Sequence, residues 1–285
     1  MRLEDFLFDR FGGLSKMYLR ELVRDGKCEV NGRNENIGYR LRANDFLEIE
    51  LDITRGNAMR PENIPLDIVF EDAEIIVINK PAGMLVHPTH RDKSGTLLNA
   101  LSFYLNRAKT DGIPSIRPGL VHRLDKQTSG LMIVAKTAQA HRVLSDHLSR
   151  KLVKKRYIAL VDGVCEQDNG IISHSIGRFA EEKRWGVKAD GKSAETRYCV
   201  LERYSNSTLL ELEPVTGRTN QLRIHCASIG HPITGDTTRG GREFTRLCLH
   251  AAQLAFKHPV TGDLLEFFSP VVFDQIAVEE NRGLV

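Results

Sequence analysis

The chain has 285 residues, enough for one large domain or for a large domain with a small companion. Apolar residues make up 41% and charged residues 27%, which argues against a disordered chain, and the formal charge of +3 permits a polyanionic partner without indicating one. Five scattered cysteines without a CxxC pair, and no apolar run near the roughly 20 residues that span a bilayer, predict a cytoplasmic protein with no disulfide framework, zinc knuckle or membrane association.

Residues 1–52 predict a small α/β module. The stretch LSKMYLRELVRDGK (14–27) predicts an amphipathic helix that ends at Gly26, and CEVNG (28–32) and DFLEIELD (45–52) predict short strands. Three cations recur every four residues along this helix: Lys16, Arg20 and Arg24. Such a stripe either contacts a nucleic acid or is a solvated helix flank, and the block as a whole holds more acids than bases.

The segment from Leu14 through ELVRDGKCEVNG to LRANDFLEIE resembles the S4-like RNA-binding module. In that family, a basic helix pair and a V-N-G strand lie along an RNA backbone. The resemblance therefore implies that residues 1–52 bind RNA through the cationic stripe.

Residues 53–64 (ITRGNAMRPENI) lack periodicity and predict a linker. Residues 65–285 alternate strand-like and helix-like patterns. We expect strands in AEIIVINK, GLMIVAK, KRYIALV, TRYCVLERY, TLLELEP and LEFFSP. We expect helices in HRVLSDHLSRKL and in NQLRIHCASIG, with Gly230 closing the second one. This order predicts an α+β domain with a mixed, largely antiparallel sheet.

The stretch PGLVHRLDKQTSGLMIVAKT (118–137) places a single carboxylate, Asp125, between Arg123 and Lys126. Neighbouring positive charge lowers the pKa of a carboxylate, so we expect Asp125 to be ionised and able to act as a nucleophile or general base. The alternative from the residues alone is a structural salt bridge next to a turn.

The stretch KKRYIALVDG (154–163) places Tyr157 on a predicted strand. A basic run precedes the tyrosine: Arg150, Lys151, Lys154, Lys155 and Arg156. This run is either a track for RNA phosphates or a solvated helix end.

The stretch GVKADGKS fits the phosphate-loop pattern GxxxxGK[ST] through Gly186, Gly191, Lys192 and Ser193. A phosphate loop needs a buried strand before it and a helix after it. Here the preceding RFAEEKRW is too charged, and the following AETRYCVLERY alternates as a strand does. We therefore expect no nucleotide site, and we interpret Gly191 as part of a hairpin turn.

The stretches HRLDKQTSG, KKRYIALV, VTGRTNQLRIHCASIGHPITGD and RLCLHAAQLAF, in this order, resemble elements of the RluA-type RNA pseudouridine synthases. The resemblance runs from NKPAGMLVHP (79–88) to near the end of the chain. It implies isomerisation of uridine, in which uracil leaves the ribose through nitrogen 1 and rejoins it through carbon 5. Such a reaction needs no cofactor, metal or nucleotide.

The resemblance also implies roles for individual residues. Asp125 matches the essential aspartate, which either attacks the sugar or assists an elimination, and Arg223 matches its basic partner. Tyr157 matches a tyrosine that stacks on uracil and suits proton transfer, and Leu249 would pack under the base. Arg123 matches an arginine that holds the RNA open around the flipped nucleotide.

Two positions depart from the family pattern. Asn220 replaces a usual histidine and Gln127 a common aspartate, which affects the expected hydrogen bonds around the bound nucleotide. We expect a monomeric enzyme acting on ribosomal RNA of the large subunit. Transfer RNA is the alternative substrate, and the rival functions are a non-catalytic RNA-binding protein of this fold and a nucleotide hydrolase.

Overall fold

A computed structural model describes residues 1–11, 14, 16–51, 60–89, 91–107, 116–182, 184–271 and 273. The chain divides into two compact units. One comprises Met1–Pro65, His87–Gly119 and Lys136–Ala138, and the other comprises Leu66–Val86, Leu120–Ala135 and Gln139–Val285. Residues 53–59 of the predicted linker lie outside the described residues, and the domain boundaries at 52 and 65 stay a prediction.

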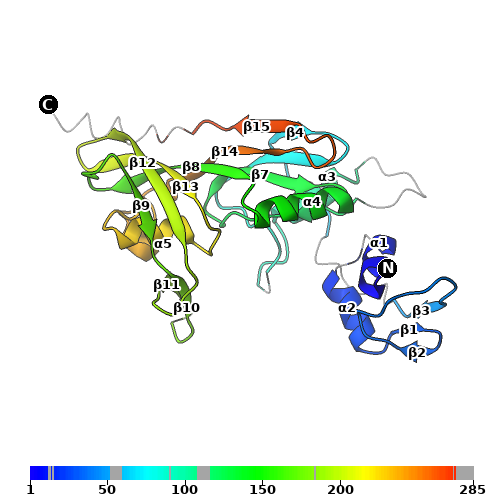
Figure 1. Ribbon diagram of the computed structural model, residues 1–285. Coiled ribbons are helices and arrows are strands. Elements are labelled where there is room, and N and C mark those ends of the chain that lie inside the picture. Colours follow the sequence, from blue (N-terminus) through cyan, green and yellow to red (C-terminus); the bar gives the residue numbers. More distant parts are fainter. Residues whose placement is uncertain are drawn as a thin grey trace. The chain divides into compact units, whose positions relative to one another are not determined.

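The first unit contains a small sheet with two helices (Figure 1). The predicted helix is α2 (Lys16–Arg24), and the predicted strands are β1 (Cys28–Val30) and β3 (Leu47–Ile49). The structure adds α1 (Leu3–Arg10) and β2 (Arg33–Asn34), and the strands pair antiparallel in the order β2-β1-β3. Apolar side chains from α1, α2 and β1 form its core. The same unit holds α3 (Leu97–Tyr104), whose N-terminus is closed by a capping box between Thr96 and Asn99.

The second unit is built on a sheet that has ten strands within the described residues. Its main path has the order β4-β5-β7-β14-β8-β13-β12-β9, with β15 on β14 and β6 on β7. Most neighbours run antiparallel, and β14 lies parallel to β7, so the predicted α+β fold is confirmed. The strands are β4 (Ile68–Glu71), β5 (Ile75–Lys80), β6 (Gly119–Leu120), β7 (Ser129–Ala135), β8 (Lys154–Asp162), β9 (Asn169–Ser173), β12 (Glu195–Arg203), β13 (Ser207–Pro214), β14 (Leu249–Lys257) and β15 (Leu264–Phe268).

Helices α4 (Ala138–Ser149) and α5 (Gln221–Ser228) belong to this sheet unit (Figure 1). Helix α4 buries Ala140 and Leu144 in a core cluster with side chains of β5, β7 and β14. Helix α5 ends in a Schellman motif, because His231 N–H donates to the Cys226 carbonyl at 3.1 Å and Gly230 N–H to the Ala227 carbonyl at 3.1 Å. Gly230 therefore closes the helix, as the sequence predicts.

The segment that resembles a phosphate loop lies in and after a hairpin. Strands β10 (Ile176–Phe179) and β11 (Arg184–Val187) pair antiparallel, and the chain then turns and enters strand β12. Gly191 lies in that turn, with its N–H donating to the Lys188 carbonyl at 2.9 Å. A strand and not a helix follows Ser193, so the interpretation of this stretch as a turn is confirmed.

Strand β14 approaches β7 closely at Gly130. The residue has a φ of 114° and pairs with Ala251, and a β-carbon there would lie 2.4 Å from the Ala251 carbonyl oxygen. Glycine is thus required where the two strands meet. No helix in the described part of the chain combines the length and apolarity needed to cross a membrane.

Candidate active site

A cavity of about 670 Å³ opens in the second unit, a size typical of ligand sites. Its wall comes from the loop before β7, the end of α4, strand β8 and the loop that leads into α5. The predicted site residues that line it are Arg123, Asp125, Lys151, Lys155, Tyr157, Asn220, Arg223 and Leu249. The fold therefore brings together residues that lie more than a hundred positions apart in the chain.

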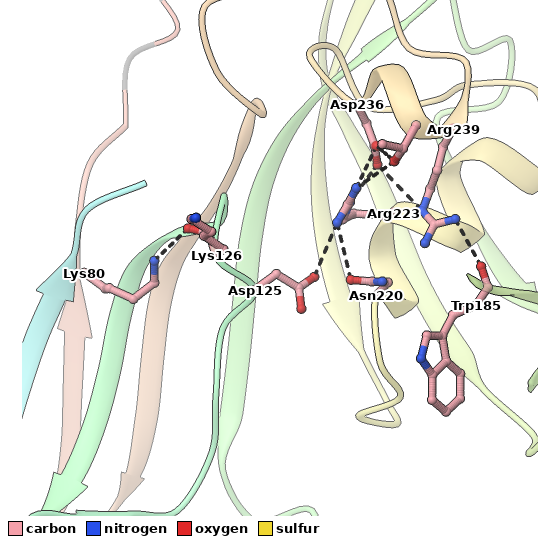
Figure 2. Close-up of polar contacts among 9 residues, drawn as sticks. Lys80, Asp125, Lys126, Trp185, Asn220, Arg223, Asp236 and Arg239 are labelled. Atoms are coloured by element: carbon pink, nitrogen blue, oxygen red, sulfur yellow. Dashed lines mark hydrogen bonds and ion pairs between the residues drawn. The ribbon is translucent and has the colours of Figure 1, made fainter. Parts of the chain in front are cut away.

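Asp125 lies in the loop between β6 and β7, and its backbone is held from two sides. Its carbonyl accepts from Thr128 N–H at 3.1 Å. The carbonyl of the next residue, Lys126, accepts from Gly83 N–H at 2.8 Å and from Lys80 Nζ at 3.2 Å. Figure 2 shows the Asp125 side chain pointing toward Arg223 and Asn220, and it is 25% exposed. The carboxylate is thus fixed at the wall of the cavity.

Burial raises the pKa of Asp125, and the charges of Arg223, Arg123 and Arg239 offset this only in part. The expectation of a lowered pKa is therefore wrong. The physical reason is that Arg123 and Lys126, its neighbours in sequence, are exposed to solvent, whereas the Asp125 side chain is three-quarters buried. The nearest guanidinium nitrogen, Arg223 Nη1, lies 4.0 Å from Asp125 Oδ2.

Arg223 is held mainly by a residue that the sequence analysis did not single out, Asp236. Arg223 Nε and Nη2 each donate to the Asp236 carboxylate at 2.7 Å, which leaves Nη1 to face Asp125. Asp236 is 1% exposed, and although burial opposes its ionisation, hydrogen bonds from Arg223 and Thr238 hold its pKa below the usual value. The second acid therefore aims the guanidinium at the first (Figure 2).

The signal for Asp236 in the sequence was weak. Asp236 ends the stretch GHPITGD, thirteen residues after Arg223, which lies on a predicted helix. This spacing does not show that the loop after the helix brings Asp236 back to Arg223. Arg239, which lies within 3.7 Å of the same carboxylate, was missed for the same reason.

Asn220 precedes α5 with a φ of 55°, in the left-handed region that asparagine adopts more readily than most residues. One end of its carboxamide lies 2.7 Å from Asp125 Oδ2. Because a carboxylate only accepts hydrogen bonds, the amide nitrogen must be the end that faces it. The asparagine that departs from the family pattern therefore still supplies a donor to Asp125.

Strand β8 presents alternate side chains to the cavity. Lys155 and Tyr157 line it, whereas Arg156 lies 3.1 Å from Glu211 and does not. Tyr157 is 9% exposed, and burial, with a further contribution from the charge of Asp125, raises the pKa of its phenol far above the usual value. The hydroxyl thus keeps its proton. Leu249, 3% exposed on β14, adds an apolar surface.

The remaining predicted RNA contacts lie elsewhere. Arg150 is 3.4 Å from Asp146 on α4, and Lys154 is exposed but does not line the cavity. In the first unit, Arg20 pairs with Glu4 and Arg24 with Asp25, and the Lys16 side chain lies outside the described residues. No group of three His, Cys, Asp or Glu side chains suited to a metal ion occurs in the described ranges.

A family model for RNA pseudouridylate synthases matches residues 74–228. An uncharacterised RNA pseudouridine synthase of Bacillus subtilis is 38% identical, with 98% of this chain and 93% of that protein aligned. The ribosomal large subunit pseudouridine synthase D of Pasteurella multocida is 36% identical, over 98% of this chain and 90% of that protein.

Two solved human structures are also similar. RNA pseudouridylate synthase domain containing 1 is 27% identical with a TM-score of 0.60, covering 80% of this chain and 98% of that one. RNA pseudouridylate synthase domain containing 4 is 23% identical with a TM-score of 0.62, covering 76% and 93%, and shows a shared fold.

Proposed function

The chain belongs to the RNA pseudouridylate synthase family and is an isomerase that acts on RNA, and we propose that its substrate is ribosomal RNA of the large subunit. The relative in Pasteurella multocida, which is similar over nearly its whole length, bears that substrate in its name. We also propose that Asp125, Arg223 and Tyr157 are the catalytic residues.

The observation that carries this proposal is that Asp125 is the one carboxylate among the described residues that line the cavity. Both routes to pseudouridine, attack on the sugar and assisted elimination, use an ionised carboxylate next to the ribose. Burial disfavours that charged form, and Arg223 Nη1 and the Asn220 amide favour it. Because Asp236 accepts hydrogen bonds from two guanidinium nitrogens of Arg223, the third, Nη1, stays 4.0 Å from Asp125 Oδ2. Arg223 therefore does not form a tight ion pair with Asp125 that would block access of the substrate to the carboxylate.

Tyr157 and Leu249 provide the aromatic and apolar surfaces that a detached uracil needs while it turns. The phenol stays protonated, so its hydroxyl serves as a hydrogen-bond donor or acid and not as a base. A uridine in folded RNA reaches such a cavity only after it is flipped out, at a cost of a few kcal/mol. We assign to Arg123 the role of holding the RNA open around the flipped base, because it is exposed and lines the cavity beside Asp125.

RNA affinity would come from cations around this cavity and from the N-terminal module. Lys151 and Lys155 line the cavity, and Arg123 and Asn220 add polar contacts for the nucleotide. We further propose that residues 1–52 form an S4-like RNA-binding domain, that residues 65–285 form the catalytic domain, and that the protein acts as a monomer.

The test is pseudouridine formation in unmodified transcripts of large-subunit ribosomal RNA and, separately, of transfer RNA. The wild-type chain should modify the ribosomal transcript, and Asp125→Asn should form no pseudouridine while binding the same RNA. The matched control is Asp168→Asn, an exposed acid of the same unit, which should keep wild-type turnover. Turnover by Asp125→Asn would refute the catalytic assignment, and modification of transfer RNA alone would refute the substrate.

A further inference from the structure

A second hollow of about 410 Å³ lies between the β10–β11 hairpin and the loop that leads into α5. Four cations line it: Arg178, Lys188, Lys192 and Arg218. The only acid among its described lining residues is Asp190, which lies 3.0 Å from Lys188 Nζ. The hollow therefore carries a surplus of positive charge, whereas the chain as a whole is close to neutral.

This hollow adjoins the active-site cavity, since Gly217, Arg218 and Thr219 line both. Arg218 Nε donates to the Ser193 carbonyl, next to Lys192, at 3.1 Å, and this bond joins the two sides of the hollow. A second bond connects the hollow to the catalytic cluster, because Arg239 Nη1 donates to the Trp185 carbonyl at 3.2 Å (Figure 2). A ligand that lies in the hollow would thus lie directly beside a nucleotide in the cavity.

The backbone beneath the cations is fixed. Ile176 and Lys192 exchange two backbone hydrogen bonds of 2.9 Å, and Lys188 N–H donates to the Ser175 carbonyl at 2.9 Å. A β-carbon on Gly191 would lie 2.5 Å from the Ile176 carbonyl carbon, so the glycine lets the turn pack on β10. The GKS stretch therefore presents its lysine from a rigid turn, without the helix N-terminus that a nucleotide phosphate site uses.

We propose that this groove, formed by Arg178, Lys188, Lys192, Arg218 and Trp185, binds the phosphodiester backbone of the substrate RNA next to the target uridine. The proposal rests on the proposed function, because it assumes that RNA fills the neighbouring cavity. Several cations on an open, rigid surface match a chain of singly charged phosphates, and base edges are not needed for such contacts.

The salt dependence of RNA binding tests the groove. Each lost phosphate contact on single-stranded RNA lowers the slope of log affinity against log salt by about 0.7. The slope of the triple variant R178Q/K188Q/K192Q should therefore be smaller in magnitude by about 2. The three substitutions should weaken RNA affinity and leave the single-turnover rate of saturated enzyme nearly unchanged. Lys192→Gln alone should lose about 0.7, and Lys257→Gln, an exposed lysine on β14 outside both hollows, should lose nothing.

Trp185 gives an independent readout, because it is the single tryptophan of the chain and it lines the groove. Titration with an unmodified large-subunit ribosomal transcript should change its fluorescence in the wild type. In the triple variant the same change should require at least tenfold more RNA.

A wild-type slope in the triple variant, or no response of Trp185 to bound RNA, would overturn the proposal. Micromolar ATP binding that Lys192→Gln abolishes would also overturn it, in favour of a nucleotide site. If the wild type modifies the transcript while the triple variant keeps its slope, only the groove assignment fails. If the wild type modifies no RNA, the proposed function fails, and the groove is then judged by its slope and fluorescence alone.

Discussion

Replacing Arg223 by glutamine should lower the free energy of unfolding by about 3 kcal/mol, because it leaves Asp236 charged and buried. The pair is joined by two hydrogen bonds of 2.7 Å, and its side chains are 16% and 1% exposed. Loss of one partner of a buried pair costs about 3–5 kcal/mol, and two remaining partners of Asp236, Thr238 at 2.7 Å and Arg239 at 3.7 Å, keep the value at the lower end. Asp236→Asn should cost less, since Arg223 keeps the Asp125 carboxylate at 4.0 Å and still donates to Thr238 Oγ1 at 3.1 Å.

A double-mutant cycle measured by urea denaturation checks this reasoning. The coupling free energy between Arg223→Gln and Asp236→Asn should reach about 2 kcal/mol. The matched control is the pair of Arg203 and Asp168, which has the same distance of 2.7 Å but side chains that are 35% and 80% exposed. Its coupling should stay below about 1 kcal/mol. Equal coupling in the two pairs would show that burial does not decide the strength of the Arg223 contact, and the reasoning would fail.

Three further outcomes follow from buried or strained groups. Asp125→Asn should raise the melting temperature at pH 7, because folding buries the carboxylate and raises its pKa. Calorimetry across pH should show this gain vanish below pH 3.8, the usual pKa, where the carboxyl group is protonated in both the folded and the unfolded state. Burial lowers the pKa of Lys80 from 10.5 to about 8, so the free energy of unfolding of the wild type, relative to Lys80→Met, should rise between pH 8 and 10.5 by up to about 3 kcal/mol. Urea titrations in which the two proteins show the same dependence of this free energy on pH would contradict the prediction. Lys151, in the turn that follows α4, has a φ of 58°, so Lys151→Gly should stabilise the fold by about 1 kcal/mol yet weaken RNA binding in filter assays. A destabilised glycine variant would show that the positive φ of Lys151 does not strain the fold.

The elements that the sequence predicts correctly are those whose signals are local. Short apolar runs identify strands such as β7, which is buried along its whole length, and β8, and the glycine after α5 marks the end of that helix. Helix α1 went unpredicted, because its apolar positions are mixed with acids in a short stretch. Strand β14 was recognised as a family element and not as a strand, since its sequence AAQLAF has no strict alternation.

The site was predictable in its members and not in its electrostatics. Resemblance named Asp125, Tyr157 and Arg223, and these side chains line one cavity. The pKa of Asp125 was predicted in the wrong direction, because proximity in sequence to Arg123 does not reveal that the carboxylate is mostly buried and the guanidinium solvated. The anchoring of Arg223 by Asp236 depends on a loop closing over a helix, which no local pattern encodes.

The contact between Gly130 and Ala251 limits which residues position 130 can accept. Leu249, two residues before Ala251, is a wall of the cavity, and Asp125 lies five residues before Gly130. A single methyl group at position 130 would force the parallel seam of the sheet open and carry both walls apart. The geometry of the cavity thus depends on the absence of a side chain at position 130, where a β-carbon would lie 2.4 Å from the Ala251 carbonyl oxygen.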